Sequence, residues 1–218
     1  MTNEVMARED YWAGVYFTQR REGVLQPPSQ FAAFVAQEVG AAFKIIDVGC
    51  GNGRDSLFFA ALGFKVFAID QSEEAVQMVQ QKAKERGNDN LACAVGSVTE
   101  PLLETILRNC GDSSLCVYAR FFLHAVSEGE QAVFFETLAK WLKPGDKIAF
   151  EYRTTADQFL EKTAAPHYRR YQPASHVNSA LKYLGFSVLF EREGQGFAKF
   201  GPEDAIVARV IFEKGFVK

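Results

Sequence analysis

Short apolar runs alternate along this chain with longer stretches whose apolar residues return every three or four positions. The run FKIIDVG is almost continuously apolar, which is typical of a strand buried on both faces of a sheet. Val76, Val79 and Ala83 recur at helical spacing in one of the longer stretches. The pattern predicts strands at 43–49, 64–70, 90–97, 114–121, 147–154, 186–194 and 205–213. It predicts helices at 30–40, 54–63, 73–87, 100–110, 128–142 and 175–185.

Capping residues support several of these helix boundaries. Ser29 and Ser72 each stand directly before a helical stretch, where a hydroxyl can accept from a free backbone N–H. Ser127 and Glu130 have the spacing of a capping box. Gly87 follows the last position of its helical pattern, as helix-ending glycines do.

The alternation of strands and helices predicts an α/β protein with a mostly parallel, doubly wound sheet and helices on both faces. The last two strands are joined without a clear helix, so the final strand is expected to be antiparallel. Residues 1–218 are expected to form a single domain. Pro27 and Pro28 interrupt regular structure and separate an N-terminal arm or lid, residues 1–28, from the rest.

Composition narrows the possible functions. The formal net charge is -3, which gives no support for nucleic-acid binding. No apolar run approaches the roughly 18 residues that span a membrane, and the first ten residues contain no apolar signal-peptide centre. The four cysteines lack metal-ligand spacing. These features predict a cytoplasmic protein with no membrane partner, and they leave the oligomeric state open.

A glycine-rich loop follows the first predicted strand. Gly49, Gly51 and Gly53 form a GxGxG pattern preceded by Asp47, whereas dinucleotide sites have GxGxxG. Ligands of doubly wound sheets bind at the carboxyl ends of such strands, where glycines allow close approach to the backbone. Asp70 ends the second predicted strand, at about the distance where a ribose-binding carboxylate is expected.

The segment DVGCGNGRDSLFFAALGFKVFAID, residues 47–70, resembles motif I through the acidic loop of class I S-adenosylmethionine-dependent methyltransferases. Its GCGNGR portion is similar to the tellurite-resistance and thiopurine methyltransferase branches. The resemblance implies a Rossmann-like, seven-stranded sheet with an antiparallel last strand. It also implies S-adenosylmethionine as cofactor and S-adenosylhomocysteine as product.

The resemblance assigns roles to individual residues of the cofactor site. Asp70 would bind the ribose, Gln71 would lie near the adenine, and Ser97 stands where the family often has an acidic residue that contacts adenine. From the arm, Tyr11, Trp12 and Ser29 would close over the cofactor, the alternative being an arm that only packs on the sheet. The residues expected at the methionine end are Asp47, Gly49, Gly51 and Gly53.

The family's geometry places the methyl acceptor above the fourth and fifth strands. Arginines gathered there in a chain of net charge -3 predict an anionic acceptor, because arginine suits carboxylate and phosphate. Two alternatives stay open. Arg120 pairs structurally with Glu151, and the segment HYRRY, residues 167–171, is a solvated loop. The expected substrate-binding residues are Tyr118, Glu151, Arg153, Tyr168, Arg169 and Arg170.

Catalysis is expected to involve Arg120 and a histidine, His124 or His167. A hydroxyl or amine acceptor would need such a base, whereas an ionised oxygen would need none. The sequence has no carboxylate cluster that favours a metal mechanism. The predicted function is methyl transfer to a small molecule, an anionic metabolite or a glycan- or nucleotide-linked precursor, with O-methylation favoured. The alternatives are a cofactor-binding regulator or scaffold, and a NAD-dependent dehydrogenase, which the loop spacing disfavours.

Overall fold

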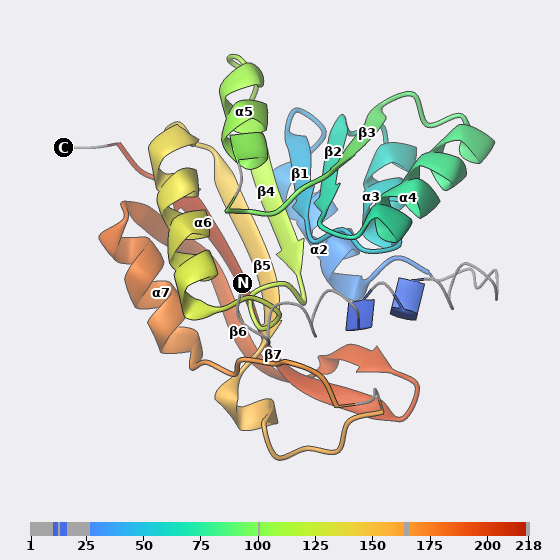
Figure 1. Ribbon diagram of the computed structural model, residues 1–218. Coiled ribbons are helices and arrows are strands. Elements are labelled where there is room, and N and C mark those ends of the chain that lie inside the picture. The colour runs from blue at the N-terminus through green and yellow to red at the C-terminus, as the bar shows by residue number, and fades with distance from the viewer. Residues whose placement is uncertain (1–10, 13, 17–26, 100, 164–165, 217–218) are drawn as a thin grey trace.

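A computed structural model describes residues 11–12, 14–16, 27–99, 101–163 and 166–216, so most of the predicted arm lies outside the described residues. Seven strands form one sheet in the order β3-β2-β1-β4-β5-β7-β6 (Figure 1). The strands are β1 (Lys44–Val48), β2 (Val66–Asp70), β3 (Leu91–Val95), β4 (Leu115–Arg120), β5 (Lys147–Arg153), β6 (Phe186–Phe200) and β7 (Glu203–Lys214).

The first five strands pair in parallel, and β7 pairs antiparallel with both β5 and β6. The chain therefore reverses its strand order between β1 and β4, which are neighbours in the sheet. Both the mostly parallel, doubly wound architecture and the antiparallel last strand are confirmed. In such sheets the crevice at this reversal is the usual ligand site.

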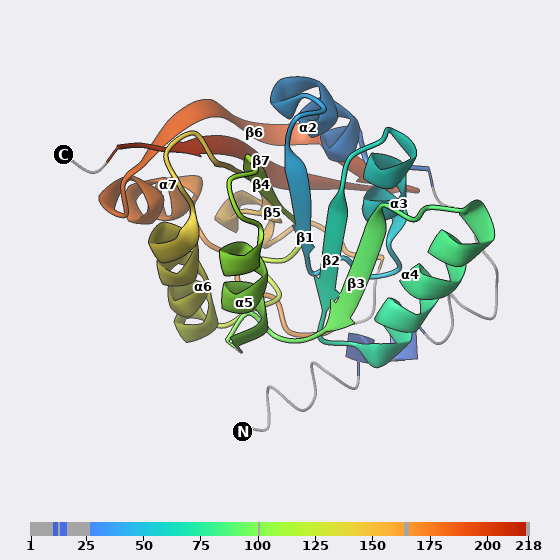
Figure 2. The ribbon, with the colours of Figure 1, turned by 90° about the horizontal axis from the view of Figure 1, so that it is seen from above.

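Helices cover both faces of the sheet (Figure 2). On one face lie α2 (Gln30–Val39), α3 (Arg54–Ala61) and α4 (Glu73–Arg86). On the other lie α5 (Pro101–Asn109), α6 (Glu128–Trp141) and α7 (Ala174–Tyr183). A single 3₁₀ turn, η1 (Thr155–Asp157), follows β5 and was not expected from the sequence.

The predicted caps are present. The Ser29 side chain accepts from the Ala32 N–H at 2.9 Å, and Ser72 caps α4 in the same way. Ser127 and Glu130 form both hydrogen bonds of a capping box at the start of α6. These bonds satisfy backbone donors that would otherwise lack partners, and each cap is worth about 1 kcal/mol.

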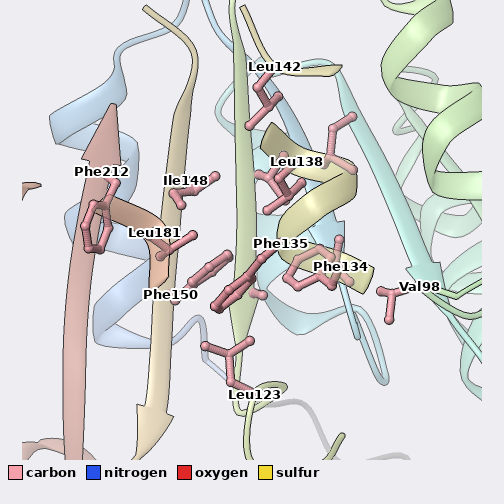
Figure 3. Close-up of a cluster of buried hydrophobic side chains, with 14 of the residues drawn as sticks. Val98, Leu123, Phe134, Phe135, Leu138, Leu142, Ile148, Phe150, Leu181 and Phe212 are labelled. Atoms are coloured by element: carbon pink, nitrogen blue, oxygen red, sulfur yellow. The ribbon is translucent and has the colours of Figure 1, made fainter. Parts of the chain in front are cut away.

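Phenylalanines fill the core between the sheet and α6 (Figure 3). The Phe135 ring stacks on Phe150 of β5 with their centroids 6.0 Å apart, and Phe134 packs beside both. Leu181 of α7 and Phe212 of β7 extend the same cluster. Dense packing of this kind gives the carboxyl ends of β4 and β5 a rigid base.

The last two strands are longer than the apolar pattern predicts. Strand β6 continues past Gly194 to Phe200, and β7 begins at Glu203 instead of 205. Glycine and lysine in the extension weaken the sequence signal, but pairing such as Ala198 with Ala205 keeps it in the sheet after a register shift. This hairpin reaches the lower edge of the sheet in Figure 1, where β4 and β5 also end.

Candidate functional site

A cavity of about 640 Å³ opens at the carboxyl ends of the parallel strands. Its volume is in the range of small-molecule sites. Fourteen of the residues predicted for the site line this cavity: Tyr11, Trp12, Asp47, Gly49, Gly51, Asp70, Gln71, Ser97, Tyr118, Arg120, His124, Arg153, His167 and Arg169. The other five, Ser29, Gly53, Glu151, Tyr168 and Arg170, do not line it.

Asp70 organises the glycine loop. Its Oδ2 accepts from the Gly51 N–H at 2.8 Å and its Oδ1 accepts from the Ser72 N–H at 2.9 Å. Burial raises the pKa of Asp70, and these backbone donors oppose the rise. The Gln71 N–H is a third backbone donor that opposes the rise. Because a carboxylate has about four acceptor sites, Asp70 still has capacity to accept from a ligand in the cavity.

Gly51 and Gly53 are glycines for different reasons. Gly51 has φ 54°, and a Cβ there would lie 2.7 Å from the Tyr16 hydroxyl, inside the cavity. Gly53 has φ 75° and precedes α3, where a Cβ would meet a Val79 methyl at 2.6 Å. Gly51 thus makes room for the Tyr16 hydroxyl at the cavity wall, whereas Gly53 allows α3 and α4 to pack.

Two more carboxylates lie beside the loop. Asp47 accepts from the Ser56 hydroxyl at 2.5 Å, and burial raises the pKa of Asp47 to about 8. Asp55 lines the cavity and accepts from the Tyr118 hydroxyl at 2.8 Å. Ser29 bonds to Asp55 through its N–H at 2.7 Å and its hydroxyl at 2.8 Å. Ser29 therefore positions Asp55 and does not itself line the cavity.

Arg120 forms an ion pair with Glu151, which is the structural pairing that the sequence left open as an alternative to ligand binding. The Arg120 Nε donates to Glu151 Oε1 at 2.7 Å, and the Arg209 Nε donates to Oε2 at 2.6 Å. Glu151 is fully buried between the two guanidinium groups, which explains why it does not reach the cavity. Arg120 itself still lines the cavity.

Arg153 is also engaged by carboxylates. Its Nη1 donates to Asp157 Oδ2 at 2.7 Å, and its Nη2 bonds to Glu203. Glu203 also accepts from the Thr163 N–H and hydroxyl at 2.9 and 2.7 Å. Burial opposes the change, but the bonds from Thr163 and Arg153 lower the pKa of Glu203 to about 2. Arg153 therefore has less capacity for a ligand than the sequence implied.

Phe121 lies between the two arginines in an unusual backbone conformation. Its φ is 56°, rare for a residue with a side chain, and its N–H donates to the Glu151 carbonyl at 2.7 Å. The guanidinium carbons of Arg120 and Arg153 lie 4.3 and 5.3 Å from its ring centroid. Backbone strain of this kind persists where the surroundings impose it, and functional sites are common places for it.

The arginines of the HYRRY segment differ in their roles. Arg170 donates from Nε to the Val126 carbonyl at 3.1 Å and from Nη2 to the Leu123 carbonyl at 3.3 Å, away from the cavity. Tyr168 does not line the cavity either. Arg169 does line it, and no carboxylate of the described residues pairs with it. Arg169 is thus the cation of this segment that a ligand can contact.

His124 lies just beyond β4 and is 4% exposed. Its Nδ1 accepts from the Arg153 N–H at 3.3 Å. Burial and then the nearby Arg153 and Arg169 lower the pKa of His124 well below its ordinary value. His124 in the folded chain is therefore a weaker base than a solvent-exposed histidine.

The described part of the arm covers the opening. Residues 11–12 and 14–16 are helical, and the Tyr11 ring stacks on His167 with centroids 4.0 Å apart. Trp12 contacts the same histidine edge-on at 5.3 Å and stacks on Tyr16 at 6.0 Å. Aromatic contacts thus join the arm to the HYRRY segment across the cavity.

Sequence reasoning missed several residues of the cavity wall. Asp55 was read only as part of a helix start, although an acid beside the glycine loop was a usable signal. Ala198, Phe200 and Glu203 come from the hairpin extension that the apolar pattern did not reveal. Tyr16 lies in the predicted arm, but nothing in its spacing distinguishes it from the neighbouring aromatic residues.

No helix within the described residues has the length and hydropathy to span a membrane. Within the same ranges, no three histidine, cysteine or acidic side chains are grouped as metal ligands.

Comparison with known proteins yields a family and several relatives. Residues 45–145 match the model of a methyltransferase domain. Over 131 residues the chain is 31% identical to the ubiquinone biosynthesis O-methyltransferase of Caulobacter vibrioides, covering 59% of this chain and 49% of that one. Over 88 residues it is 30% identical to TehB, a probable S-adenosyl-L-methionine-dependent methyltransferase of Haemophilus influenzae, covering 40% and 28%. The chain thus spans about half or less of the length of these curated relatives.

Among solved structures, a methyltransferase described as SAM-dependent from Anabaena variabilis superposes with a TM-score of 0.70. The superposition covers 98% of this chain and 96% of the Anabaena chain, and the two sequences are 20% identical. At that identity the similarity establishes the fold alone. The Rossmann-like sheet predicted from the sequence is confirmed.

Proposed function

We propose that this chain is a class I S-adenosylmethionine-dependent methyltransferase that methylates a small-molecule acceptor, because residues 45–145 match a methyltransferase-domain model and two curated methyltransferases are about 30% identical over part of the chain. One observation carries the proposal: the glycine loop, Asp70 and the HYRRY segment line a single cavity. A ligand at the loop and a ligand at the arginines would therefore be neighbours. Group transfer between two bound molecules requires such proximity.

The residues present fit the cofactor. Gly51 lies on the cavity wall next to the Tyr16 hydroxyl, and Asp70 on the same wall keeps acceptor capacity suited to a ribose hydroxyl. Asp47 and Asp55 add carboxyl groups next to this space, which suits the positive charges of the cofactor's methionine part. Gln71 and Ser97 lie on the same cavity and are proposed to contact the adenine.

The acceptor is proposed to be a small anionic molecule that is methylated on oxygen. S-adenosylmethionine supplies a sulfonium methyl group: the acceptor oxygen forms the new bond with its own lone pair, and sulfur keeps the pair of the broken bond. Arg169 bonds to the Tyr171 side chain but to no carboxylate of the described residues, so its guanidinium would contact the anion; Arg120 lines the same cavity. The name of the Caulobacter relative gives independent support for O-methylation.

The arm is proposed to act as a lid over a single domain. Tyr11 and Trp12 contact His167, so closing the arm would link the cofactor end of the cavity to the HYRRY segment. A closed lid excludes water, which strengthens electrostatic contacts to both ligands.

Turnover tests the proposal directly. The protein is incubated with S-adenosylmethionine and a pool of small acids, and the pool is searched by mass spectrometry for a gain of one methyl group. We expect at least one acid to gain the methyl group together with stoichiometric S-adenosylhomocysteine. Cofactor binding with no methylated product from any acid, alcohol or amine pool would instead indicate a regulator or scaffold.

A further inference from the structure

The end of the cavity that lies above β4 and β5 contains an imidazole whose proton is fixed in place. His124 is almost fully buried, and its Nδ1 accepts from the Arg153 backbone N–H at 3.3 Å. A ring nitrogen that accepts a hydrogen bond has no proton of its own, so the neutral ring has its proton on Nε2. Because His124 lines the cavity, it is an N–H donor for a ligand bound there.

Basic side chains surround this ring. They are Arg120 of β4, Arg153 of β5, and His167 and Arg169 of the HYRRY segment. The Phe121 ring meets it edge-on with centroids 5.4 Å apart. Asp157 and Glu203 lie behind Arg153 and are bonded to it. A proton taken up by His124 would thus add a buried positive charge among existing ones, which makes the ring a poor general base.

Two other titratable side chains nearby, Tyr118 and Glu203, are already engaged in hydrogen bonds, which makes each a poor acceptor for a substrate proton. The Tyr118 hydroxyl donates to Asp55 at 2.8 Å. Glu203 accepts hydrogen bonds from Arg153 and from both donors of Thr163. A neutral hydroxyl acceptor would have to lose its proton in this setting, whereas an ionised oxygen has none to lose.

We propose that His124 donates a hydrogen bond from Nε2 to the methyl-accepting oxygen, and that this oxygen enters the cavity already ionised, as a carboxylate oxygen does. The inference rests on the proposed methyl transfer and specifies its acceptor. Such a charge-assisted bond is short and directional, so it selects which oxygen lone pair faces the methyl group. Arg169 binds the same anion, and the product is a methyl ester formed without release of a proton.

The proton on His124 can be located without any substrate. The chain has three histidines, His124, His167 and His176, so ¹⁵N NMR of histidine-labelled protein resolves few side chains, and His124→Gln assigns one of them. We expect a neutral His124 with its proton on Nε2 from pH 6 to pH 8. A proton on Nδ1, or a doubly protonated ring in this range, overturns the proposal.

Two substitutions separate a donor from a base once a methylated acid is known. His124→Gln places an amide N–H near the position of Nε2, and His124→Phe keeps a ring without a donor. We expect His124→Gln to retain kcat/KM within about tenfold and His124→Phe to lose about 10- to 100-fold. The affinity for S-adenosylhomocysteine is expected to stay at the wild-type value in both. His176→Gln, on the exposed surface of α7, is the matched control and should change nothing.

The remaining outcomes are distinct. Equal losses in the two variants, with a wild-type kcat/KM that falls toward acidic pH as one group protonates, identify His124 as a base and overturn this proposal alone. A neutral alcohol or amine as the preferred acceptor also overturns it and leaves methyl transfer intact. If no acceptor of any kind is methylated, the proposed function fails and this proposal fails with it.

Discussion

The two ends of the cavity have opposite electrostatic character. At the glycine loop, Asp47, Asp55 and Asp70 bond mainly to backbone N–H groups and hydroxyls. Above β4 and β5, Arg120 and Arg153 bond to carboxylates, and Arg169 faces the cavity without one among the described residues. The pKa values reflect this contrast, since burial raises that of Asp47 to about 8 while hydrogen bonds lower that of Glu203 to about 2.

The difference indicates which ligand each end suits. At the loop end only Asp55 has a cationic partner among the described residues, Arg54 Nε at 3.4 Å, so the surplus of acids there favours a positively charged ligand. A guanidinium without a carboxylate partner favours an anion. A methyl donor with a sulfonium and an acid that accepts the methyl group match this arrangement. The predictions below alter one end at a time and ask whether the other end responds.

The largest effect is expected at the glycine loop. Gly51→Val places a branched side chain on a backbone with φ 54° and against the Tyr16 hydroxyl, on the wall of the proposed cofactor site. We expect cofactor affinity to fall more than about 100-fold by calorimetry, at a cost above roughly 3 kcal/mol. Gly129→Ala is the control, because a Cβ there meets nothing within 4 Å. Circular dichroism must show that both variants fold, and wild-type binding by a folded Gly51→Val would place the ligand elsewhere.

Asp70→Ala should produce the next largest effect. The substitution removes the partners of two backbone N–H groups and of the proposed ribose hydroxyls. Unpaired polar groups cost about 1 to 3 kcal/mol, so cofactor affinity should fall about 10- to 100-fold in the same titration. Asp89→Ala, at an exposed turn, is the control. If the arginine end of the cavity acts independently of the glycine loop, the affinity of Asp70→Ala for the acid acceptor should stay close to that of the wild type.

The stability of the protein without ligand should depend on pH through Asp47. Its folded pKa of about 8 lies above the ordinary carboxyl value near 4, so between these values the folded state binds a proton that the unfolded state has lost. The contribution of Asp47 to the free energy of unfolding is therefore greatest below about pH 4. It falls as pH rises toward 8, by at most about 1.4 kcal/mol per pH unit. Urea denaturation at several pH values measures the slope. Asp47→Asn should flatten it, and an unchanged slope would show that another group titrates.

The smallest effect is expected for Arg169→Ala. Loss of one charge-assisted contact should raise the acceptor KM about tenfold and leave cofactor affinity unchanged. Arg169→Lys should rescue only part of the loss, because lysine lacks the planar fork. Arg170→Ala should instead lower the melting temperature, since Arg170 bonds to the Val126 and Leu123 carbonyls. Equal kinetic effects of the two alanine variants would contradict this division of roles.

Most of the fold could be predicted from the sequence because each element has a local signal. Apolar runs marked the strands, and Ser29, Ser72 and Ser127 marked helix starts that the structure retains. The hairpin extension to Phe200 was missed because its stability comes from pairing with β7, which depends on residues distant in sequence. Local signals thus predicted elements better than their tertiary extensions.

The candidate site was predicted unevenly for the same reason. Asp47, Gly51 and Asp70 stand at fixed spacings after strands, so their arrival at one cavity could be expected. The functions of arginines depend on which carboxylate lies opposite, and no local pattern shows that Arg153 faces Asp157 and Glu203. Sequence alone therefore suggested several anion-binding arginines where the structure leaves Arg169 as the accessible cation.

Titration calorimetry of the wild-type protein with S-adenosylmethionine, S-adenosylhomocysteine and NAD tests the central assignment most directly. The glycine-loop spacing, Asp70 and the acidic character of that end predict that both sulfur compounds bind and that NAD binds far more weakly. The site should bind one equivalent, and Asp70→Ala should weaken it. Tight binding of NAD, with no heat from either sulfur compound, would contradict the account.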